Sequence, residues 1–393
     1  MRSMTKEQAV CRMRHAHHLD RKLPRDQILE AASACGFVNS PPGSWELAVR
    51  ARVEAVSRND LHRELIETKR LMQAWSLRGA PTIFPTAEAG TFLGALAAQE
   101  DEVPIYAQPL SYTAQALKAD QKVLLEALRQ ACRILDDSVV VGKAQLDHVL
   151  AEAMKSYLPP SVRSQADEPS LVAKNQTLLE AAVSYLLRQC SLEGRVMMGE
   201  RQKQEPVFLS PSAWFGSALD NQQQPQRIVD QFLHCYGPAS VQDFARWTGC
   251  SRMQAQRLWA LSEAERIEVD VQGQRGWMLK ADLEELDRLP QETSAMQLLG
   301  THDPFLDLPQ RSWILTDPAA QKKVWRLVGS PGVVLHKSQI VGIWNAPVQK
   351  GKAQARITLF KALTPAQRDQ VCAEMIQLQG FLQRPMGTCD FLE

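Results

Sequence analysis

The sequence predicts an α+β fold, mainly α, in which three modules of three helices and a β-hairpin precede a small β-barrel-like domain with one helix. Two observations carry this prediction. The order helix, short β segment, helix, helix, hairpin occurs after residue 100 and again, in a near-repeat, after residue 220. The last hundred residues instead hold apolar runs rich in β-branched residues, which are typical of strands.

The first hundred residues are predicted to be mostly helical. Thr5 is placed to cap a first helix, and Pro24 to open a second that Gly36 ends. Two more helices are expected after the break SPPGS, with Ser44 and Asn59 as caps, and the second of them extends through LMQAW. Residues 80–85 read as a short strand, and residues 86–98 as helix. This part fits a third, more diverged copy of the module.

The two central modules show the pattern more clearly. In the first, helices at 119–135, 138–154 and 175–192 precede two short strand-like runs around the polar turn GERQKQEP. In the second, helices at 225–237, 239–249 and 251–267 precede a hairpin around Gly273, with Ser240 and Ser251 as caps. Three helices followed by a hairpin are the winged-helix order.

The C-terminal part changes in character. Segments 312–317, 332–347 and 353–363 read as strands joined by polar turns, and a long helix follows, with Thr364 as its cap and Pro365 at its first position. A small β-barrel or a curled sheet, closed by one helix, fits this composition. The predicted domains are 1–100, 101–220 and 221–290 for the three winged helices and 291–393 for the β-barrel-like domain.

The composition limits the function classes. Hydrophobic residues make up 45% of the chain and charged residues 23%, as in an ordinary globular protein, and the formal net charge is +1. A near-neutral chain argues against strong non-specific DNA affinity, although a local basic stripe is compatible with it. We find neither an apolar run of 18 residues nor the apolar core of a signal peptide, so we expect a cytoplasmic monomer without a membrane segment.

Cofactor and metal motifs are missing from the sequence. The eight cysteines include no CxxC pair, so we expect reduced cysteines and neither a disulfide framework nor a zinc cluster. His15, His17 and His18 are expected on a helix surface, and we expect no metal and no cofactor. Dinucleotide, P-loop, HExxH and GxSxG motifs are absent, which excludes the enzyme classes that they mark.

Winged helices place one helix in the major groove of duplex DNA and a hairpin on its backbone. Side chains that read bases or bind phosphate occur on the third helix of the 221–290 module and at the hairpin tip of the 101–220 module. They are Arg252, Gln254, Gln256 and Arg257 on the helix and Arg201 and Lys203 at the tip. The alternative is that these are solvated surface positions, or that the modules bind another protein.

Four stretches carry a resemblance to a known family: MQAWSLRGAPTIF, YGPASVQDFARWTG, LLGTHDPFLDLPQRS and VVLHKSQIVGIWNAP. Across most of its length the chain resembles the tandem winged-helix proteins that include the AlkZ- and YcaQ-type DNA glycosylases. The resemblance implies cleavage of the N-glycosidic bonds of alkylated or crosslinked bases in double-stranded DNA. It also implies that a Gln-aliphatic-Gln or Gln-aliphatic-Asp motif does the chemistry.

At the motif position the chain departs from the family pattern. Asn39 falls on the first Gln and Pro41 on the second polar residue, with Ser40 between them. Pro41 offers neither a side-chain donor nor a base, so the motif is degenerate. Glu46 is the nearest carboxylate and is the second catalytic candidate, although its place in the first turn of a helix also explains it.

The resemblance also marks residues for a DNA cleft. Trp75 and Arg78 match one of these stretches, with Arg78 as a phosphate contact. The alternative is that Trp75 is a core residue and that Arg78 is paired with a nearby carboxylate. Asp303 matches another, although an Asp before a Pro is also a common turn starter. His302 lies beside it, where the resemblance would place a Phe, and is a candidate titratable group near the cleft. We therefore predict a duplex DNA-binding protein whose glycosylase activity is weak, altered or absent. A non-catalytic winged-helix transcriptional regulator and a protein–protein scaffold are the alternatives.

Overall fold

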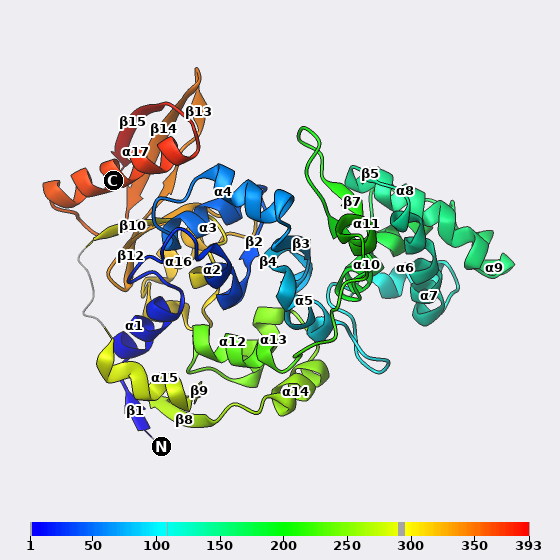
Figure 1. The fold of residues 1–393 in the computed structure, drawn as a ribbon, viewed down its shortest axis with the longest axis horizontal. Coiled ribbons are helices and arrows are strands. Elements are labelled where there is room, and N and C mark those ends of the chain that lie inside the picture. Colours follow the sequence, from blue (N-terminus) through cyan, green and yellow to red (C-terminus); the bar gives the residue numbers. More distant parts are fainter. Residues whose placement is uncertain (1, 108, 290–294, 393) are drawn as a thin grey trace. The chain divides into compact units, whose positions relative to one another are not determined.

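The computed structural model describes residues 2–107, 109–289 and 295–392, and its chain forms two compact units (Figure 1). The first unit comprises residues 1–64, 230–240 and 264–393, and the second comprises residues 65–229 and 241–263. Helices and sheets occur in both units, which confirms the expected mixture of the two. The division into four domains stays a prediction, and its boundary at 290/291 falls outside the described residues.

The helices of the first unit begin mostly where the sequence supplies caps. Thr5 and Gln8 form a capping box at the start of α1, and Thr364 with Gln367 forms another at α17, which confirms both predicted caps. The helices are α1 (Lys6–Ala16), α2 (Ile28–Cys35), α3 (Ser44–Arg52), α4 (Arg58–His62), α15 (Lys280–Glu285), α16 (Pro318–Val324) and α17 (Pro365–Phe381), with most of α12 (Arg227–Tyr236). Short helical turns are η7 (Leu286–Arg288), η8 (Pro304–Asp307) and η9 (Arg311–Trp313), and the π-helix η1 (Arg63–Glu67) lies at the end of the first segment.

Two sheets complete the first unit. One has the order β1-β8-β9, in which β1 (Arg2–Met4) pairs in parallel with β8 (Arg266–Val271), and β8 forms a hairpin with β9 (Gln274–Leu279) around Gly273. The other has the order β10-β11-β12-β14-β13, with β15 paired to β14. Its strands are β10 (Met296–Leu299), β11 (Gly332–His336), β12 (Gln339–Asn345), β13 (Val348–Gln349), β14 (Lys352–Leu359) and β15 (Met386–Leu392). It packs its apolar face on α17 through a core that includes Val334, Ile357 and Met375, so the C-terminal part forms the expected curled sheet against a long helix. The expectation of one helix is wrong because α16 is a second, and the strand expected at 312–317 is instead the end of η9 and the loop before α16.

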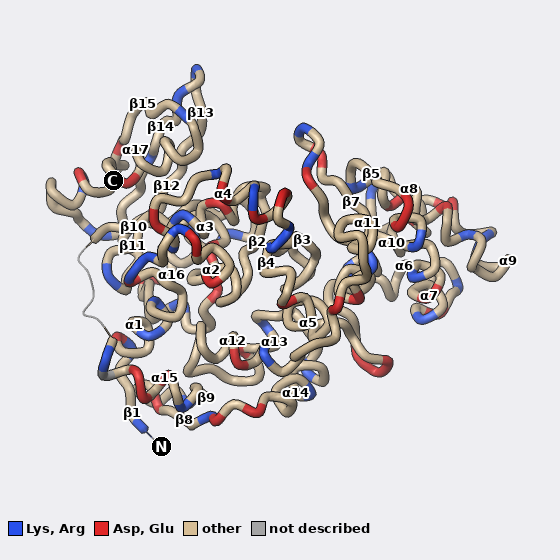
Figure 2. Tube along the Cα trace, in the orientation of Figure 1, with Lys and Arg blue, Asp and Glu red and all other residues tan. Residues whose placement is uncertain are grey.

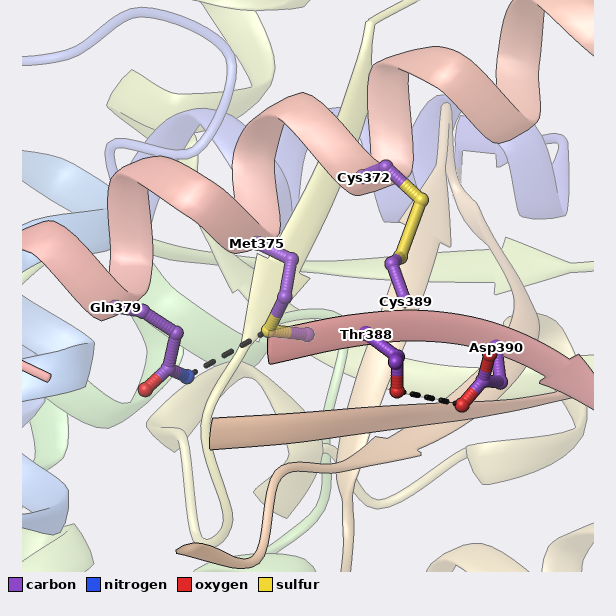
Figure 3. The surroundings of a disulfide bond; sticks show 6 residues. All are labelled: Cys372, Met375, Gln379, Thr388, Cys389 and Asp390. Carbon is purple, nitrogen blue, oxygen red and sulfur yellow. Dashed lines mark hydrogen bonds between the residues drawn. A yellow bond between two sulfur atoms is a disulfide. The ribbon is translucent and has the colours of Figure 1, made fainter. Parts of the chain in front are cut away.

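One pair of cysteines contradicts the expectation of reduced thiols. Cys372 of α17 and Cys389 of β15 are joined by a disulfide, with a Cα–Cα distance of 6.0 Å (Figure 3). The two cysteines are 17 residues apart and come together because β15 returns beside β14, under α17. Sequence spacing alone does not reveal this proximity. The disulfide fixes the last strand to the helix.

The second unit is a helical layer on an antiparallel sheet. The helices are α5 (Ala89–Phe92), α6 (Leu110–Ala116), α7 (Gln121–Ala131), α8 (Lys143–Met154), α9 (Pro160–Arg163), α10 (Leu178–Leu192), α11 (Pro211–Phe215), α13 (Val241–Thr248) and α14 (Arg252–Leu261). Short turns are η2 (Leu77–Gly79), η3 (Thr86–Glu88), η4 (Gly94–Leu96), η5 (Cys132–Asp136) and η6 (Lys155–Tyr157). The strands follow the order β4-β3-β6-β7-β5 and are β3 (Leu71–Trp75), β4 (Pro81–Pro85), β5 (Val140–Val141), β6 (Met197–Met198) and β7 (Val207–Leu209).

A partly buried ion pair and one glycine hold parts of the second unit together. Arg129 of α7 makes hydrogen bonds of 2.6–3.2 Å to the carboxylate of Glu193. Burial raises the pKa of Glu193, but the hydrogen bonds from Arg129 and Gln189 hold it below its usual value. Gly249, at φ +77°, ends α13 so close to the η2 turn that an added Cβ would lie 2.8 Å from the Cα of Arg78.

The elements of the predicted central modules occur in the expected order. Helices α7, α8 and α10 precede the β6–β7 strands, and α12, α13 and α14 precede the β8–β9 hairpin. Ser251 caps α14 as predicted, by accepting a hydrogen bond from the amide of Gln254. An antiparallel bridge joins Ala239 to Trp277 of β9. The winged-helix interpretation of this order stays a prediction.

The predictions for residues 24–96 are partly wrong. Residues 71–75, expected to continue a helix, form β3, because pairing with β4 on one side and β6 on the other outweighs local helix preference. The helix expected from Pro24 begins only at Ile28, and Ser57 rather than Asn59 caps α4. Residues 86–96 form the turn η3, the short helix α5 and the turn η4 instead of one continuous helix. There the backbone of residues 221–223 approaches so closely that a Cβ on Gly90 or Gly94 would overlap it.

Among the residues that the structure describes, none of the helices combines the length and the apolar character that crossing a bilayer requires.

Candidate functional site

The loop between α2 and α3 holds Asn39, the first candidate. Strand β2 (Phe37–Val38) leads into it, and the Asn39 side chain is buried to all but 7%. Its Oδ1 accepts a hydrogen bond of 2.7 Å from the amide of Gly43, and the hydroxyl of Ser44 donates to the carbonyl of Val38 at 2.8 Å. These two bonds close the loop on itself, so the Asn39 amide oxygen is a structural acceptor in this conformation.

The three residues after Asn39 contribute little chemistry. Ser40, Pro41 and Pro42 are exposed, and the Ser40–Pro41 peptide bond is cis. The proline ring of Pro41 offers no hydrogen-bonding or titratable atom. The position that the resemblance assigns to a second polar group therefore presents an apolar ring at the surface.

Glu46, the second catalytic candidate, is engaged in an ion pair. Arg58 donates from Nε at 2.8 Å and from Nη2 at 3.1 Å to its two carboxylate oxygens. The Glu46 side chain is 15% exposed and that of Arg58 44%. Both carboxylate oxygens of Glu46 are therefore engaged by Arg58.

Beneath the loop lies a buried ion pair. Arg52 of α3 donates to both oxygens of Asp303 at 2.7 and 2.8 Å, and the two side chains are 1% and 0% exposed. Asp303 also accepts a hydrogen bond from the amide of Phe305, and Arg52 lies over the ring of Phe37, 5.6 Å from its centroid. The pair therefore ties α3 and β2 to the turn before η8. Asp303, predicted as a cleft residue, is in the core of its unit.

The other predicted cleft residues differ in exposure. His302 is exposed and has a φ of 56°, beside the buried pair. Trp75 is 4% exposed, stacks on Phe208 with a centroid distance of 5.3 Å and lies under the guanidinium of Arg188. Arg78 donates from Nη1 to the carbonyl of Trp247 at 2.8 Å. Trp75 is thus a core residue of the second unit, and Arg78 joins η2 to α13.

The predicted DNA contacts on α14 fall into two groups. Gln254 is fully buried and donates to the carbonyl of Leu96 at 2.8 Å, and Arg257 makes a bidentate ion pair with Glu102 at 2.7 and 2.9 Å. These two side chains fix α14 to the rest of its unit. Arg252 and Gln256, by contrast, are exposed.

The hairpin tip carries the other two basic candidates. Arg201 and Lys203 are exposed in the turn between β6 and β7, where the bridge between Gln202 and Glu205 closes the hairpin. Figure 2 shows basic residues at this tip with acidic residues next to them. The acidic neighbours are Glu200 and Glu205. The exposed basic charge there is confined to the end of the hairpin.

A cavity of about 700 Å³ in the second unit does not suit phosphate. Its lining includes four carboxylates and two cations: Glu100, Glu102, Asp120, Glu126, Lys122 and Arg129. Burial raises the pKa of Glu102, but the ion pair with Arg257 lowers it below the usual value, so this carboxylate is charged at neutral pH. The excess of negative charge repels a nucleic-acid backbone.

Sequence reasoning missed the buried arginine at the centre of the first unit. A signal for it exists: in SWELAVRARV, Arg52 follows Trp45 by seven residues and Ala48 by four, which places it on the apolar face of α3. An arginine on such a face needs a buried carboxylate partner. The sequence does not say which carboxylate, because Asp303 is 251 residues away.

Comparison with known proteins places the chain in a family. The sequence profile of the family "DNA glycosylase AlkZ-like" matches residues 32–381. The chain is 25% identical over 321 residues to the "Interstrand DNA cross-link repair glycosylase" of Streptomyces sahachiroi, covering 79% of this chain and 80% of that protein. The solved structure of Streptomyces sahachiroi DNA glycosylase AlkZ has the same fold, with a TM-score of 0.76 and 20% identity over 99% of this chain and 100% of the other. The profile spans most of the chain, and the chain therefore belongs to the AlkZ-like DNA glycosylase family.

Proposed function

We propose that the chain is a duplex DNA-binding repair protein of the glycosylase type, acting on alkylated or crosslinked DNA, and that its base-releasing activity is weak, altered or absent. One observation carries the second half of this proposal. At the motif position the oxygen of Asn39 is bonded to the amide of Gly43, and Pro41 supplies no polar group.

The chemistry explains why this observation matters. An N7-alkylated purine carries a positive charge, so its departure is easy, and the enzyme mainly has to position water and stabilise the sugar cation. Two polar side chains, two residues apart, can share these tasks. Here one of the two is shorter and engaged, and the other is missing. Glu46 is a poor substitute while Arg58 holds both of its oxygens.

Base release tests the catalytic half. The protein is incubated with duplex DNA that contains N7-methylguanine or an N7 crosslink, and free base is measured under single-turnover conditions. We expect slow release or none, and any release should depend on Asn39. Asn39→Asp keeps an acceptor for the Gly43 amide, so it preserves the loop, and it adds a negative charge. Asn39→Ala removes the polar side chain and with it the acceptor for Gly43. Release that is unchanged in Asn39→Ala would show that the site lies elsewhere.

Mobility shift tests the DNA-binding half. The four exposed candidates are Arg201, Lys203, Arg252 and Gln256. Each phosphate contact contributes about 0.9 to the slope of log affinity against log salt, so Arg201→Ala/Lys203→Ala should reduce that slope by about 2. Lys322→Ala, which removes an exposed charge from α16 of the first unit, is the matched control and should change little.

The same two assays separate the alternatives. Binding to duplex DNA without base release from any alkylated substrate would favour a non-catalytic regulator, for which the missing motif residue is the support. A failure to shift DNA at low salt would favour a protein–protein scaffold, for which the formal net charge of +1 is the support.

A further inference from the structure

Three buried residues of the first unit form a group that the sequence does not show. His17 follows the end of α1, Cys35 is the last residue of α2, and Cys235 lies on α12. Their exposed fractions are 1%, 3% and 0%. One potential ligand atom from each lies within 4.8 Å of those of the other two. Among the residues that the structure describes, this is the group of histidines, cysteines and carboxylates with the spacing for a metal ion.

The geometry is close to that of a zinc site. Zn–S bonds of about 2.3 Å and Zn–N bonds of about 2.0 Å in a tetrahedron place the ligand atoms roughly 3.4 to 3.8 Å apart. The three ligand atoms lie within 4.8 Å of one another, so small side-chain movements would bring them to these separations. Thiolate and imidazole together are the ligand types that zinc selects, and three protein ligands leave a fourth position for another donor.

The surroundings of the group favour a metal over an empty core. Nε2 of His17 is buried and has no hydrogen-bond partner among the described residues, although a buried ring nitrogen normally has one. The His17 ring is held edge-on by Tyr236 at 5.0 Å and by Phe305 at 5.7 Å between centroids. The three elements that carry the ligands thus meet around a ring that is packed against two aromatic side chains.

The charges of the three side chains would balance the ion. Two cysteine thiolates and one neutral imidazole carry two negative charges, which match the charge of a divalent cation.

We propose that His17, Cys35 and Cys235 bind one zinc ion, which fixes α1, α2 and α12 to one another within the first unit. Cys35 lies four residues before Asn39, so the ion would also anchor the start of the Asn39 loop. The role is structural and does not depend on the proposed glycosylase activity. The expectation that the three histidines lie together on a helix surface is wrong for His17: His15 bonds to Asp20, while His17 points into the core.

Metal content tests the proposal. The full chain, without a histidine tag, is purified from zinc-supplemented cells without chelator and analysed by inductively coupled plasma mass spectrometry. We expect about one zinc per chain, and loss of that zinc in Cys35→Ser and Cys235→Ser. Cys190→Ser is the matched control, because Cys190 and Cys132 form a second buried thiol pair with a mutual hydrogen bond in the second unit. This variant should keep its zinc.

A second measurement covers the case in which the cysteine variants do not fold. Cobalt replaces zinc in the wild-type chain, and the absorption spectrum should show thiolate-to-cobalt charge transfer and the visible bands of tetrahedral cobalt. Substoichiometric metal in the wild-type chain, copper in place of zinc, or a Cys35–Cys235 disulfide in non-reducing peptide mass spectra would each overturn the proposal. So would zinc that is retained in both cysteine variants.

Discussion

The buried pair of Arg52 and Asp303 makes the sharpest prediction for stability. Asp303→Ala leaves a guanidinium that is 1% exposed without its carboxylate, and Arg52→Met leaves the carboxylate without its guanidinium. Removing one partner of a buried ion pair costs about 3–5 kcal/mol, because the remaining charge stays desolvated. Each variant should therefore lose about that much free energy of unfolding, measured by urea denaturation with tryptophan fluorescence.

The double variant separates this cause from simple loss of packing. With both charges removed, no ion stays buried, so Arg52→Met/Asp303→Ala should lose clearly less than the sum of the single losses. The partly exposed pair of Arg58 and Glu46 is the control, and Arg58→Ala should cost at most about 1 kcal/mol. Strictly additive losses, or a loss below about 1 kcal/mol in either single variant, would refute the reasoning.

Three further predictions concern other parts of the fold. The folded-state pKa of Glu193 is lowered, so its carboxylate stabilises the fold above its unfolded pKa and loses this effect as the pH falls through the folded value. Glu193→Gln should therefore lower the melting temperature at pH 7 and approach the wild type below about pH 4; a constant difference would contradict this. Cys372→Ser/Cys389→Ser opens a disulfide that spans 17 residues and should cost about 3 kcal/mol in thermal unfolding without reductant, and nothing when reductant is present for both proteins. Gly249→Ala should destabilise the chain more than Gly273→Ala. Both glycines have a positive φ, which alone costs an alanine about 1–2 kcal/mol, but only the Cβ added at 249 meets backbone. Equal losses of stability in the two variants would argue against that contact.

Local sequence signals predicted the elements that local chemistry decides. The caps at Thr5, Ser251 and Thr364 are confirmed, and so is the hairpin around Gly273. These features depend on hydrogen bonds between residues a few positions apart, which a single sequence displays. The family could also be predicted, because four stretches of the sequence resemble its members.

Features that depend on distant partners could not be predicted. The local sequence of β3 favours a helix, but pairing with β4 and β6 decides its conformation. Because β6 is more than a hundred residues away, the local sequence does not show this pairing. The disulfide, the Arg52–Asp303 pair and the group of His17, Cys35 and Cys235 each join segments that the fold brings together. Gln254 shows the same limit for a single side chain. Its place on α14 predicts a DNA contact, whereas the side chain is buried and bonded to the carbonyl of Leu96.

The central claim is that the missing polar pair at positions 39 and 41 limits base release. The most direct test restores that pair in Asn39→Gln/Pro41→Gln and compares single-turnover release of N7-methylguanine from duplex DNA with that of the unaltered chain. We expect faster release by the variant at similar DNA affinity. Rapid release by the unaltered chain that neither this variant nor Asn39→Ala changes would contradict it.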